Sequence, residues 1–477
     1  MNPSSARFLG IDLGTGSLKL AIVDGAGVVR AAAGAAYAFE TPRPGWAEIA
    51  VERWWSALRD AAAQLPADER AAVRAIGLSG QMHGVVLTDA SGRALRPALL
   101  WPDTRALALL DAWPEPQPNP LAPGMAGPLL RWIARHEPAV ADAARHALQP
   151  KDWLRVALGG AVCADRSDAC ATALAAPDGE WDRALIGRLG LPSRWFAPLA
   201  SSFDPAGALS AQAARSLGLA PGIVLATGAG DTPCAALGSG LADDGDALLT
   251  TGSGGQIVVT SRAEPAAVRG LHRYRSASGH WYTMAAMQNV GVALEAARGW
   301  LAYEWADAYR DAFAAAPSDT LAFLPYLSGE RSPWLDPAAR GGWLGAGLGD
   351  TRGTLMRAAF EGVAFALRAG LDAIRAGGAD VTMLKLAGGG SLDPRWRQLL
   401  ADALDVELRA LDGPNAAARG AALLGGVAGG HWRVADLAAL APASSPAASP
   451  SHDPALARRY ARFVDLYGRT RSWFAAG

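Results

Sequence analysis

The stretch "FLGIDLGTGSLKLAIV", residues 8–23, indicates how this chain begins to fold. A short apolar run to Ile11 is typical of a strand, and a Gly-Thr-Gly turn follows it. Apolar residues then alternate from Leu18 to Ile22, which predicts a second strand. The turn "DGAG" at 24–27 and another apolar run continue the pattern. We therefore expect a three-stranded meander whose first turn opens towards a ligand.

The second half of the chain repeats this plan. The segment "DALLTTGSGGQIVVT" (246–260) is again strand, Gly-Ser-Gly turn and strand. Later, "MLKLAGGGSLD" (383–393) resembles "AIGLSGQMHG" (75–84), since both place a glycine-containing loop after a strand. Two matching pairs in the same order favour two copies of one α/β fold.

The boundary between the copies is expected near residues 221–228. This predicts a first domain over 1–226 and a second over 227–440. Residues 441–477 then form a linker and a C-terminal helix. The segment "PASSPAASPSHDP" has the composition of a disordered linker, and Ala455–Phe474 has that of a helix. We expect this helix to pack on the first domain.

Composition excludes several classes of protein. The 477 residues carry 44 Lys and Arg against 45 Asp and Glu, a net charge of -1 without the basic excess of a nucleic-acid binder. No apolar run reaches the roughly 20 residues of a membrane span. The three cysteines form no CxxC pair, and "MNPSSARFLGIDLG" is no signal peptide. These observations predict a cytoplasmic protein without nucleic-acid or membrane partners.

The first glycine turn has the composition of an anion site. Its glycines allow close approach, and successive backbone N–H groups form a nest suited to phosphate. A carboxylate beside such a nest repels phosphate unless a divalent cation lies between them. Asp12 is therefore predicted to hold Mg²⁺, through water. An ordinary hairpin turn is the alternative. The predicted phosphate-binding residues are Gly14, Thr15, Ser17 and Lys19.

A second turn, "TTGSGG" at 250–255, repeats this device in the second domain. Two nests facing a cleft would hold a triphosphate from both sides, and neither matches a P-loop or a GxGxxG unit. The three glycines after Leu386 offer a flat surface for adenine. A helix N-cap by Ser391 or Asp393 is an alternative that is compatible with it. The predicted nucleotide-binding residues are Thr251, Gly252, Ser253, Gly389 and Gly390.

A sugar site is predicted in the loop "SGQMHG" at 79–84. Gln81 and His83 both donate and accept hydrogen bonds, and the loop follows a strand end, where α/β sheets bind ligands. A core histidine is the alternative. Turn-rich stretches elsewhere add candidates for the pocket, with burial in the core as the equal alternative. The candidates are Trp46, Trp101 and Asp103.

Asp231 lies in "ATGAGDTPCAALGSG" at 226–240, among glycines and small residues. It would cap a helix that begins near Pro233, or it would accept a proton from a substrate hydroxyl. A cap explains the aspartate but not the glycines around it. Transfer of a phosphoryl group to a hydroxyl needs such a base, and we therefore predict that Asp231 is catalytic.

Taken together, these stretches resemble the FGGY carbohydrate kinases, and within them the xylulokinase branch. The matching segments run from residue 10 to residue 426 and include "GIDLGTGSLK", "IGLSGQMHGVVL", "PKDWLR", "SDACAT", "TGAGDTPCAALGSG", "LSGERSPWLDPAARGGW" and "LAGGGSLDPRW". The resemblance implies two actin-like ATPase (ribonuclease H-like) domains flanking a central cleft. It also implies ATP and Mg²⁺ as cofactors, and the analogy extends to a homodimer.

The resemblance assigns roles residue by residue. Asp231 matches the base, and Met82 and His83 match the sugar-contacting pair. Asp12, Gly14, Thr15 and Ser17 match the first phosphate and Mg²⁺ turn, and Thr251, Gly252 and Ser253 match the second. Gly389, Asp393 and Gly291 match positions on the adenosine side.

The expected reaction is transfer of the γ-phosphoryl of ATP to a ketopentose, D-xylulose first. Three positions depart from the xylulokinase pattern: Thr232 stands beside the base where asparagine is usual, Pro102 stands in "LWPD", and the second turn reads "GSGG". Another ketose, a polyol or gluconate is the alternative substrate. A non-catalytic sensor on the same fold and an actin-like or chaperone-like ATPase are the remaining alternatives.

Overall fold

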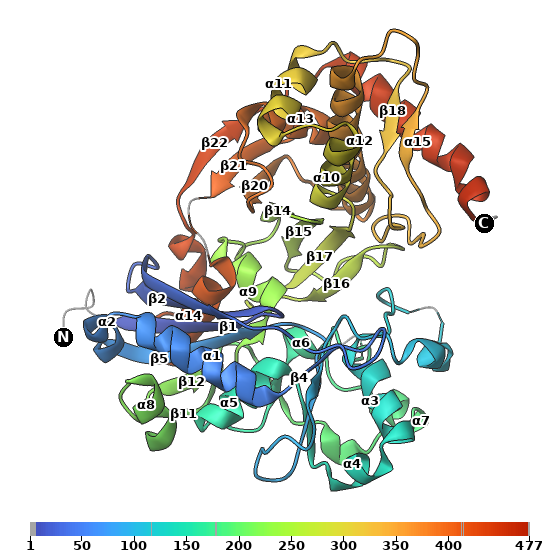
Figure 1. The fold of residues 1–477 in the computed structure, drawn as a ribbon. Helices are drawn as coiled ribbons and strands as arrows, with labels where there is room; N and C mark the ends of the chain where they lie inside the picture. Colours follow the sequence, from blue (N-terminus) through green and yellow to red (C-terminus); the bar gives the residue numbers. More distant parts are fainter. Residues whose placement is uncertain (1–5, 116, 177–178, 412, 414, 476–477) are drawn as a thin grey trace.

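The computed structural model describes residues 6–115, 117–176, 179–411, 413 and 415–475. The chain forms two lobes, each built around one large sheet (Figure 1). The two lobes agree with the predicted pair of α/β domains. Among the described residues, no helix has both the length and the apolar character that crossing a membrane requires.

The first sheet begins with the predicted meander. Strands β1, β2 and β3 run antiparallel, and β5 and β12 lie parallel to β1 on its other side. Strands β1 and β2 are buried on both faces, whereas half-buried residues alternate with exposed ones along β3. In spatial order the strands are β11 (Pro205–Ala208), β12 (Val224–Ala226), β5 (Val73–Gly80), β1 (Arg7–Leu13), β2 (Ser17–Asp24) and β3 (Val29–Ala36), with β13 (Ala229–Gly230) also beside β5.

The second sheet repeats this order. Strands β14, β15 and β17 form an antiparallel meander, and β20 and β21 lie parallel on the other side of β14. The predicted duplication is therefore confirmed in the topology. In spatial order the strands are β16 (His272–Arg275), β17 (Trp281–Met287), β15 (Gly255–Ser261), β14 (Ala247–Thr251), β20 (Met383–Ala387), β21 (Glu407–Leu411) and β22 (Ser444–Ala448).

Helices cover both sheets, and short strand pairs extend the lobes. The α-helices are α1 (Val51–Gln64), α2 (Ala67–Ala71), α3 (Ala126–His136), α4 (Pro138–Ala143), α5 (Pro150–Leu158), α6 (Arg166–Ala169), α7 (Arg183–Arg188), α8 (Ala211–Leu217), α9 (Asp231–Gly238), α10 (Gly291–Trp300), α11 (Trp305–Ala314), α12 (Arg352–Ala376), α13 (Pro394–Leu404), α14 (Ala416–Ala428) and α15 (Pro454–Ala475). The 3₁₀ helices are η2 (Leu107–Ala112), η3 (Ser193–Trp195) and η4 (Val434–Leu440). The short strands are β4 (Glu48–Ile49), β6 (Val86–Thr88), β7 (Ala98–Leu99), β8 (His146–Leu148), β9 (Ala164–Asp165), β10 (Leu199–Ala200), β18 (Ala322–Leu324) and β19 (Gly342–Leu344).

Helix α14 follows a strand of the second sheet but packs on the first. It contacts β1, β5 and α9, and its alanines and leucines share a core cluster with Phe8 and Ala75. Glycines in the strands allow this close approach. A Cβ atom on Gly10 would lie 1.7 Å from the Ala418 carbonyl oxygen, and one on Gly77 would lie 1.7 Å from that of Ala421. The helix backbone therefore rests directly on the strands.

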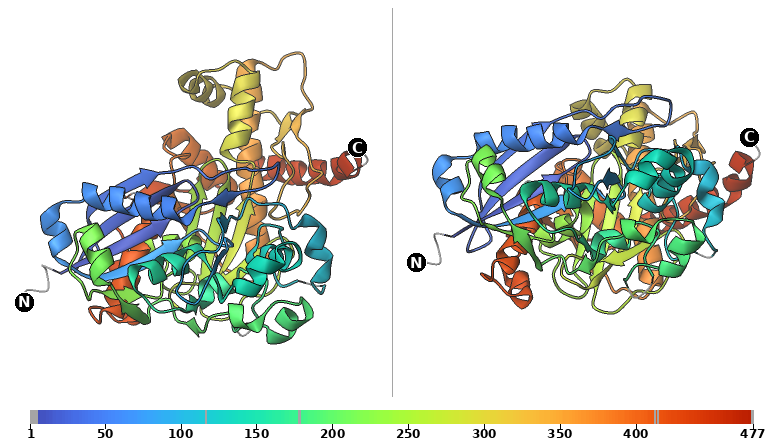
Figure 2. Two further views of the ribbon diagram at one scale, coloured as in Figure 1. Left: turned by 60° about the horizontal axis from the view of Figure 1, so that its bottom comes forward. Right: turned by 90° about the horizontal axis from the view of Figure 1, so that it is seen from below.

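The C-terminal helix corrects one prediction. Helix α15 packs on the second lobe, against α12, α13 and β18, and not on the first (Figure 1). Its buried side chains Leu456, Phe463 and Tyr467 belong to the second-lobe core, and Tyr467 donates a hydrogen bond to Asp336 at 2.7 Å. Figure 2 shows from two more directions that α15 lies away from the N-terminal strands.

The predicted disordered linker is also partly wrong. Residues 444–448 form strand β22, which pairs antiparallel with β21 at the edge of the second sheet. Edge strands tolerate proline because one side of the strand needs no backbone donor. Pro446 lies opposite Arg409 on this edge, which explains how a Ser- and Pro-rich segment can still be a strand.

Candidate active site

Asp12 lies at the end of β1, between a cation and a hydroxyl. The strand register places Lys19 of β2 on one side of Asp12 and Ser79 of β5 on the other. Ser79 Oγ donates a hydrogen bond to Asp12 Oδ1 at 2.7 Å. Burial raises the pKa of Asp12 above its usual value, and the Ser79 hydrogen bond and the Lys19 charge oppose that rise. Asp12 is therefore a desolvated carboxylate at a strand end.

The first glycine turn is connected to the predicted sugar loop. Gln81 Nε2 donates to the Gly14 carbonyl at 3.2 Å, and Thr15 Oγ1 donates to Gln81 Oε1 at 3.3 Å. Trp101, whose side chain is 44% exposed, donates from Nε1 to Thr15 Oγ1 at 2.8 Å. The structure thus brings these predicted residues together. The amide of Gln81 is engaged by the turn, so Gln81 holds the turn against the loop.

His83 is held in one orientation. Its backbone is left-handed, with φ 71°, and its Nδ1 lies 2.8 Å from the Ala171 carbonyl. Because a carbonyl only accepts, Nδ1 carries the proton and Nε2 is left as an acceptor. Burial lowers the pKa of His83 to about 4, with a further contribution from the charge of Arg331. His83 is therefore neutral at pH 7 and presents an acceptor.

Asp231 is the first residue of α9, and Gly230 occupies the N-cap position without a side-chain cap. Its carboxylate Oδ1 accepts from Thr232 N at 2.6 Å and from Thr232 Oγ1 at 3.4 Å. The alternative in which Asp231 caps the helix is thus not the observed geometry. Burial, followed by the charge of Asp12, raises the pKa of Asp231 to about 7. Such a carboxyl is suited to exchanging protons near neutral pH.

Met82 covers the residue that precedes Asp231. A Cβ atom on Gly230 would lie 2.7 Å from Met82 Cγ and 3.0 Å from its sulfur. The glycine at this position therefore makes room for Met82. The side chain of Asp231 remains partly accessible, whereas Met82 is buried.

Asp103 has a different role from the predicted one. It is fully buried, with Oδ2 accepting from Ala47 N at 2.7 Å and both oxygens engaged by Arg105. Arg105 also pairs with Glu48 at 2.6 Å and lies over the ring of Trp46 at 3.6 Å. The prediction that Asp103 contacts sugar is therefore wrong in this geometry, and Asp103 and Trp46 belong to a structural brace.

The second glycine turn is supported from behind by α10. Gly291 N donates to the Gly252 carbonyl at 3.0 Å, and Val292 N donates to that of Ser253 at 3.1 Å. A Cβ atom on Gly291 would lie 2.3 Å from the Gly252 oxygen. Gly291 is thus part of this turn's support. Thr251 Oγ1 shares a hydrogen bond with Ser391 Oγ at 2.8 Å, which connects the turn to the glycine loop.

The glycine loop after β20 has one open and one packed position. Gly389 has no neighbour that would meet a Cβ atom, whereas one on Gly390 would lie 3.2 Å from the Thr251 backbone. Asp393 caps α13, accepting from Arg395 N at 2.9 Å, and it pairs with the Arg395 side chain. The alternative that Asp393 is a helix N-cap is therefore confirmed. The open backbone at Gly389 remains compatible with an adenine surface.

The donor set can be tested against Mg²⁺. Within the described part of the chain, no group of three or more His, Cys, Asp or Glu is arranged to hold a metal ion. Mg²⁺ usually keeps several waters and binds through one or two carboxylates plus substrate phosphates. Asp12, beside the glycine turn that is predicted to bind phosphate, fits that mode of binding.

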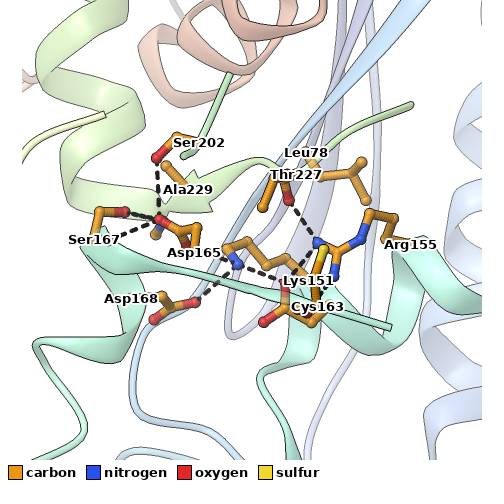
Figure 3. Close-up of polar contacts among 12 residues, drawn as sticks. Leu78, Lys151, Arg155, Cys163, Asp165, Ser167, Asp168, Ser202, Thr227 and Ala229 are labelled. Carbon is orange, nitrogen blue, oxygen red and sulfur yellow. Dashed lines mark hydrogen bonds and ion pairs between the residues drawn. The ribbon is translucent and has the colours of Figure 1, made fainter. Parts of the chain in front are cut away.

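Three functional features were missed by sequence reasoning. Ser79 holds Asp12, and Ser391 holds Thr251; in each case the partner lies on a neighbouring strand or follows one. The repetition of strand and glycine loop in the two halves of the sequence could have indicated both serines. The third feature is a buried cluster of charges around Lys151 (Figure 3). Its residues lie in "PKDWLR" (150–155), in "SDACAT" (167–172) and at Asp165 just before the second segment, and the spacing alone indicates no shared site.

Comparison with known proteins identifies the family of the chain. The model of the FGGY family of carbohydrate kinases matches in its N-terminal domain over residues 7–238 and in its C-terminal domain over residues 248–429. The xylulose kinase of Escherichia coli K12 is 34% identical over 416 residues, which cover 83% of this chain and 84% of that protein.

Solved structures share the fold along nearly the whole chain. The crystal structure of xylulose kinase from Rhodospirillum rubrum has a TM-score of 0.90 and 28% identity, covering 98% of this chain and all of that one. A gluconate kinase from Lactobacillus acidophilus has a TM-score of 0.89 at 21% identity, covering 99% of both chains, and shows the fold alone. On the strength of both matched domains and of its Escherichia coli relative, the chain belongs to the FGGY family of carbohydrate kinases.

Proposed function

We propose that this kinase phosphorylates a ketopentose, D-xylulose first, and that Asp231 is the base. The observation that carries the proposal is the Asp231 carboxyl, whose pKa is raised to about 7 by burial and by the charge of Asp12, directly after Gly230, on which the side chain of Met82 packs. The xylulose kinases among its relatives support the choice of sugar.

Asp231 accepts the proton of the sugar hydroxyl while that hydroxyl oxygen attacks the γ-phosphorus of ATP. The bond from the γ-phosphorus to the oxygen that bridges it to the β-phosphate breaks, and ADP leaves with the electron pair. Neutral His83 orients the sugar by accepting a hydrogen bond from a sugar hydroxyl at Nε2. Closure of the two lobes excludes water that would otherwise hydrolyse ATP.

The nucleotide is proposed to lie between the two glycine turns. Backbone N–H groups around Thr15 and Ser253 would contact the phosphates, and the open backbone at Gly389 would face the adenine. Asp12 would hold Mg²⁺ through water, and the ion would neutralise charge on the phosphates. Lys19 lies beside Asp12 and adds a positive charge.

A coupled assay of ADP release tests this function. The panel contains D-xylulose, other pentuloses, polyols and gluconate, each measured with ATP and Mg²⁺. We expect the highest kcat/KM for D-xylulose, and a loss of about 10²–10⁴-fold for Asp231→Ala. Near-full activity in a folded Asp231→Ala would contradict the assigned base. ATP turnover that is independent of any sugar would contradict the kinase mechanism.

Thr232 provides a sharper test of the sugar. Its hydroxyl contacts the base, and asparagine is usual at this position in xylulokinases. If D-xylulose is the substrate, Thr232→Asn should keep or raise its kcat/KM. If gluconate or a polyol is preferred by the wild-type enzyme, the same change should shift the preference towards D-xylulose.

A homodimer and a cytoplasmic location stay predictions from the sequence.

A further inference from the structure

The buried charges of Figure 3 lie directly behind the proposed sugar loop. Lys151 Nζ donates to Asp152 Oδ1 at 2.7 Å and pairs with Asp165 Oδ1 at 2.9 Å and Asp168 Oδ2 at 3.4 Å. All four side chains are fully buried. The backbone of Lys151 lies beneath Gly80, where a Cβ atom would come within 2.9 Å of Lys151 Cβ. Charges this desolvated keep a fixed geometry because each loses much free energy without its partners.

The cluster holds the segment 227–230 at both ends. At its start, Arg155 Nη1 donates to Asp152 Oδ1 at 2.6 Å and to the Thr227 carbonyl at 2.6 Å. At its end, Gly230 N donates to Ser167 Oγ at 3.4 Å. Asp231 follows immediately. The position of the proposed base is therefore connected to the cluster through backbone atoms.

Ser167 is the link between the cluster and Gly230. Asp165 Oδ2 accepts hydrogen bonds from both the backbone N and the Oγ of Ser167. Asp165 is in turn paired with Lys151. Figure 3 shows the contacts from Lys151 through Asp165 to Ser167. The hydrogen bond from Gly230 N to Ser167 Oγ continues this path to the residue that precedes Asp231.

The turn after α6 holds two other parts of the site. The Ala171 carbonyl binds Nδ1 of His83 at 2.8 Å. Cys170 Sγ accepts from Arg275 N at 3.3 Å, and Arg275 belongs to strand β16 of the second lobe. One short segment therefore contacts the base segment, the sugar loop and the opposite lobe.

We infer that Ser167, anchored by Lys151 and Asp165, is a positioning residue that fixes the Asp231 carboxylate for the transfer. This inference rests on the proposed function, because it assigns Ser167 to the same reaction. Small displacements of a positioned group lower the rate of chemistry more than they weaken substrate binding. The inference therefore predicts a loss of kcat with little change in KM.

Two serines allow a matched experiment. Ser167 and Ser202 are both buried, and both donate to Asp165 Oδ2, but the hydroxyl of Ser167 also accepts from Gly230. We expect Ser167→Ala to lower kcat by about tenfold with KM changed by less than about twofold. Ser202→Ala should leave kcat within about twofold of the wild type. Thermal unfolding midpoints show whether the two substitutions destabilise the protein equally.

Hydrogen exchange gives a second readout that needs no activity. In Ser167→Ala, amides of residues 227–238 should exchange faster by about tenfold, while other segments of the first lobe keep their rates. In Ser202→Ala the amides of residues 227–238 should keep the exchange rates of the wild type. Equal kcat values, or equal local exchange, for the two variants would overturn the inference. If the wild type phosphorylates no sugar, the proposed function fails, and the exchange result still decides whether Ser167 clamps the segment.

Discussion

The carboxyl of Asp231 is partly accessible but largely surrounded by protein, and the charge of Asp12 acts on it. Both effects favour the protonated acid and raise its pKa to about 7 from an ordinary value of 3.8. The folded state therefore binds a proton that the unfolded chain releases. As pH rises from 3.8 to 7, ionisation of Asp231 lowers the free energy of unfolding. Above pH 7 this loss has reached its full size.

Asp231→Asn should consequently stabilise the protein while it removes activity. At pH 8 we expect the free energy of unfolding to rise by about 4 kcal/mol at most, and at pH 5 by less than about half of that. Denaturant unfolding with EDTA at both pH values measures this. The exposed Asp142 supplies the control Asp142→Asn, which should change neither value. An equal gain at both pH values would contradict the electrostatic cause.

The same pKa predicts how activity depends on pH. A general base acts as the carboxylate, so kcat/KM should fall as pH is lowered through about 7. His83, with its pKa of about 4, should not titrate in this range. Initial rates between pH 5 and 9 at constant ionic strength measure the profile. A rate that stays flat down to pH 5 would be inconsistent with Asp231 as the base.

Local patterns singled out Asp12, Asp231 and His83, which each stand beside a glycine turn at a strand or helix end. In the structure the charge of Asp12 acts on Asp231, and the Ala171 carbonyl holds His83, while their roles in the reaction stay predictions. Asp103 was misread, although its partner Arg105 lies two residues away in the sequence. Glu48, which completes that brace, comes from a distant segment. Whether a side chain has a structural or a binding role depends on the residues that it contacts. Contacts with residues far away in the sequence cannot be predicted from the local pattern.

At the scale of elements, contact between α14 and the first sheet depends on glycine. A Cβ atom on Gly77 would meet the backbone of Ala421, which cannot rotate away as a side chain would. We expect Gly77→Ala to lower the free energy of unfolding by about 2–3 kcal/mol. Denaturant unfolding, with urea midpoints and slopes, measures the loss.

A matched substitution in a helix interior should act in the opposite direction. Gly468 lies in α15, is exposed, and has no neighbour that would meet a Cβ atom. Gly468→Ala should raise the free energy of unfolding by about 1 kcal/mol, because alanine restricts the unfolded chain and favours helix. If both variants changed stability alike, close packing of α14 would not be the cause of the first effect.

The strands on either side of the two glycine turns could be predicted from the sequence, but strand β22 and the placement of two helices could not. The alternating residues of β1 and β2, and their echo in β14 and β15, define the sheets locally. Helix α14 is apolar on most sides, so its sequence does not indicate which sheet it covers. Helix α15 was expected on the wrong lobe, because Leu456, Phe463 and Tyr467 would suit any apolar surface.

At the scale of the whole molecule, the side chain of Asn119 connects the first lobe to strand β16 of the second. Asn119 of the first lobe donates from Nδ2 to the Arg273 carbonyl at 3.1 Å and accepts from Arg273 N at 2.7 Å. The side-chain amide of Asn119 thus makes the two hydrogen bonds that the backbone of a neighbouring strand would make with β16. A cavity of about 760 Å³ adjoins this contact, lined by residues of both lobes, including Pro120, Gly270 and Leu271.

Asn119→Ala should therefore favour a wider opening of the lobes. We expect a larger radius of gyration in small-angle scattering and a KM for sugar that is higher by about fivefold, the worth of one or two neutral hydrogen bonds. The kcat should change little, since the base is untouched. Gln117→Ala is the control, because Gln117 bonds only within its own loop among the described contacts. If the two variants had the same radius of gyration and the same KM, Asn119 would not be holding the lobes together.

The position of α14 has a consequence for synthesis on the ribosome. The strands of the first sheet are complete once β13 has emerged, yet the helix that covers them is encoded far downstream. At ordinary elongation rates the uncovered face waits on the order of ten seconds for residues 416–428. The nascent N-terminal half should therefore be a client of chaperones that shield apolar surface, and fragments that stop short of α14 should aggregate.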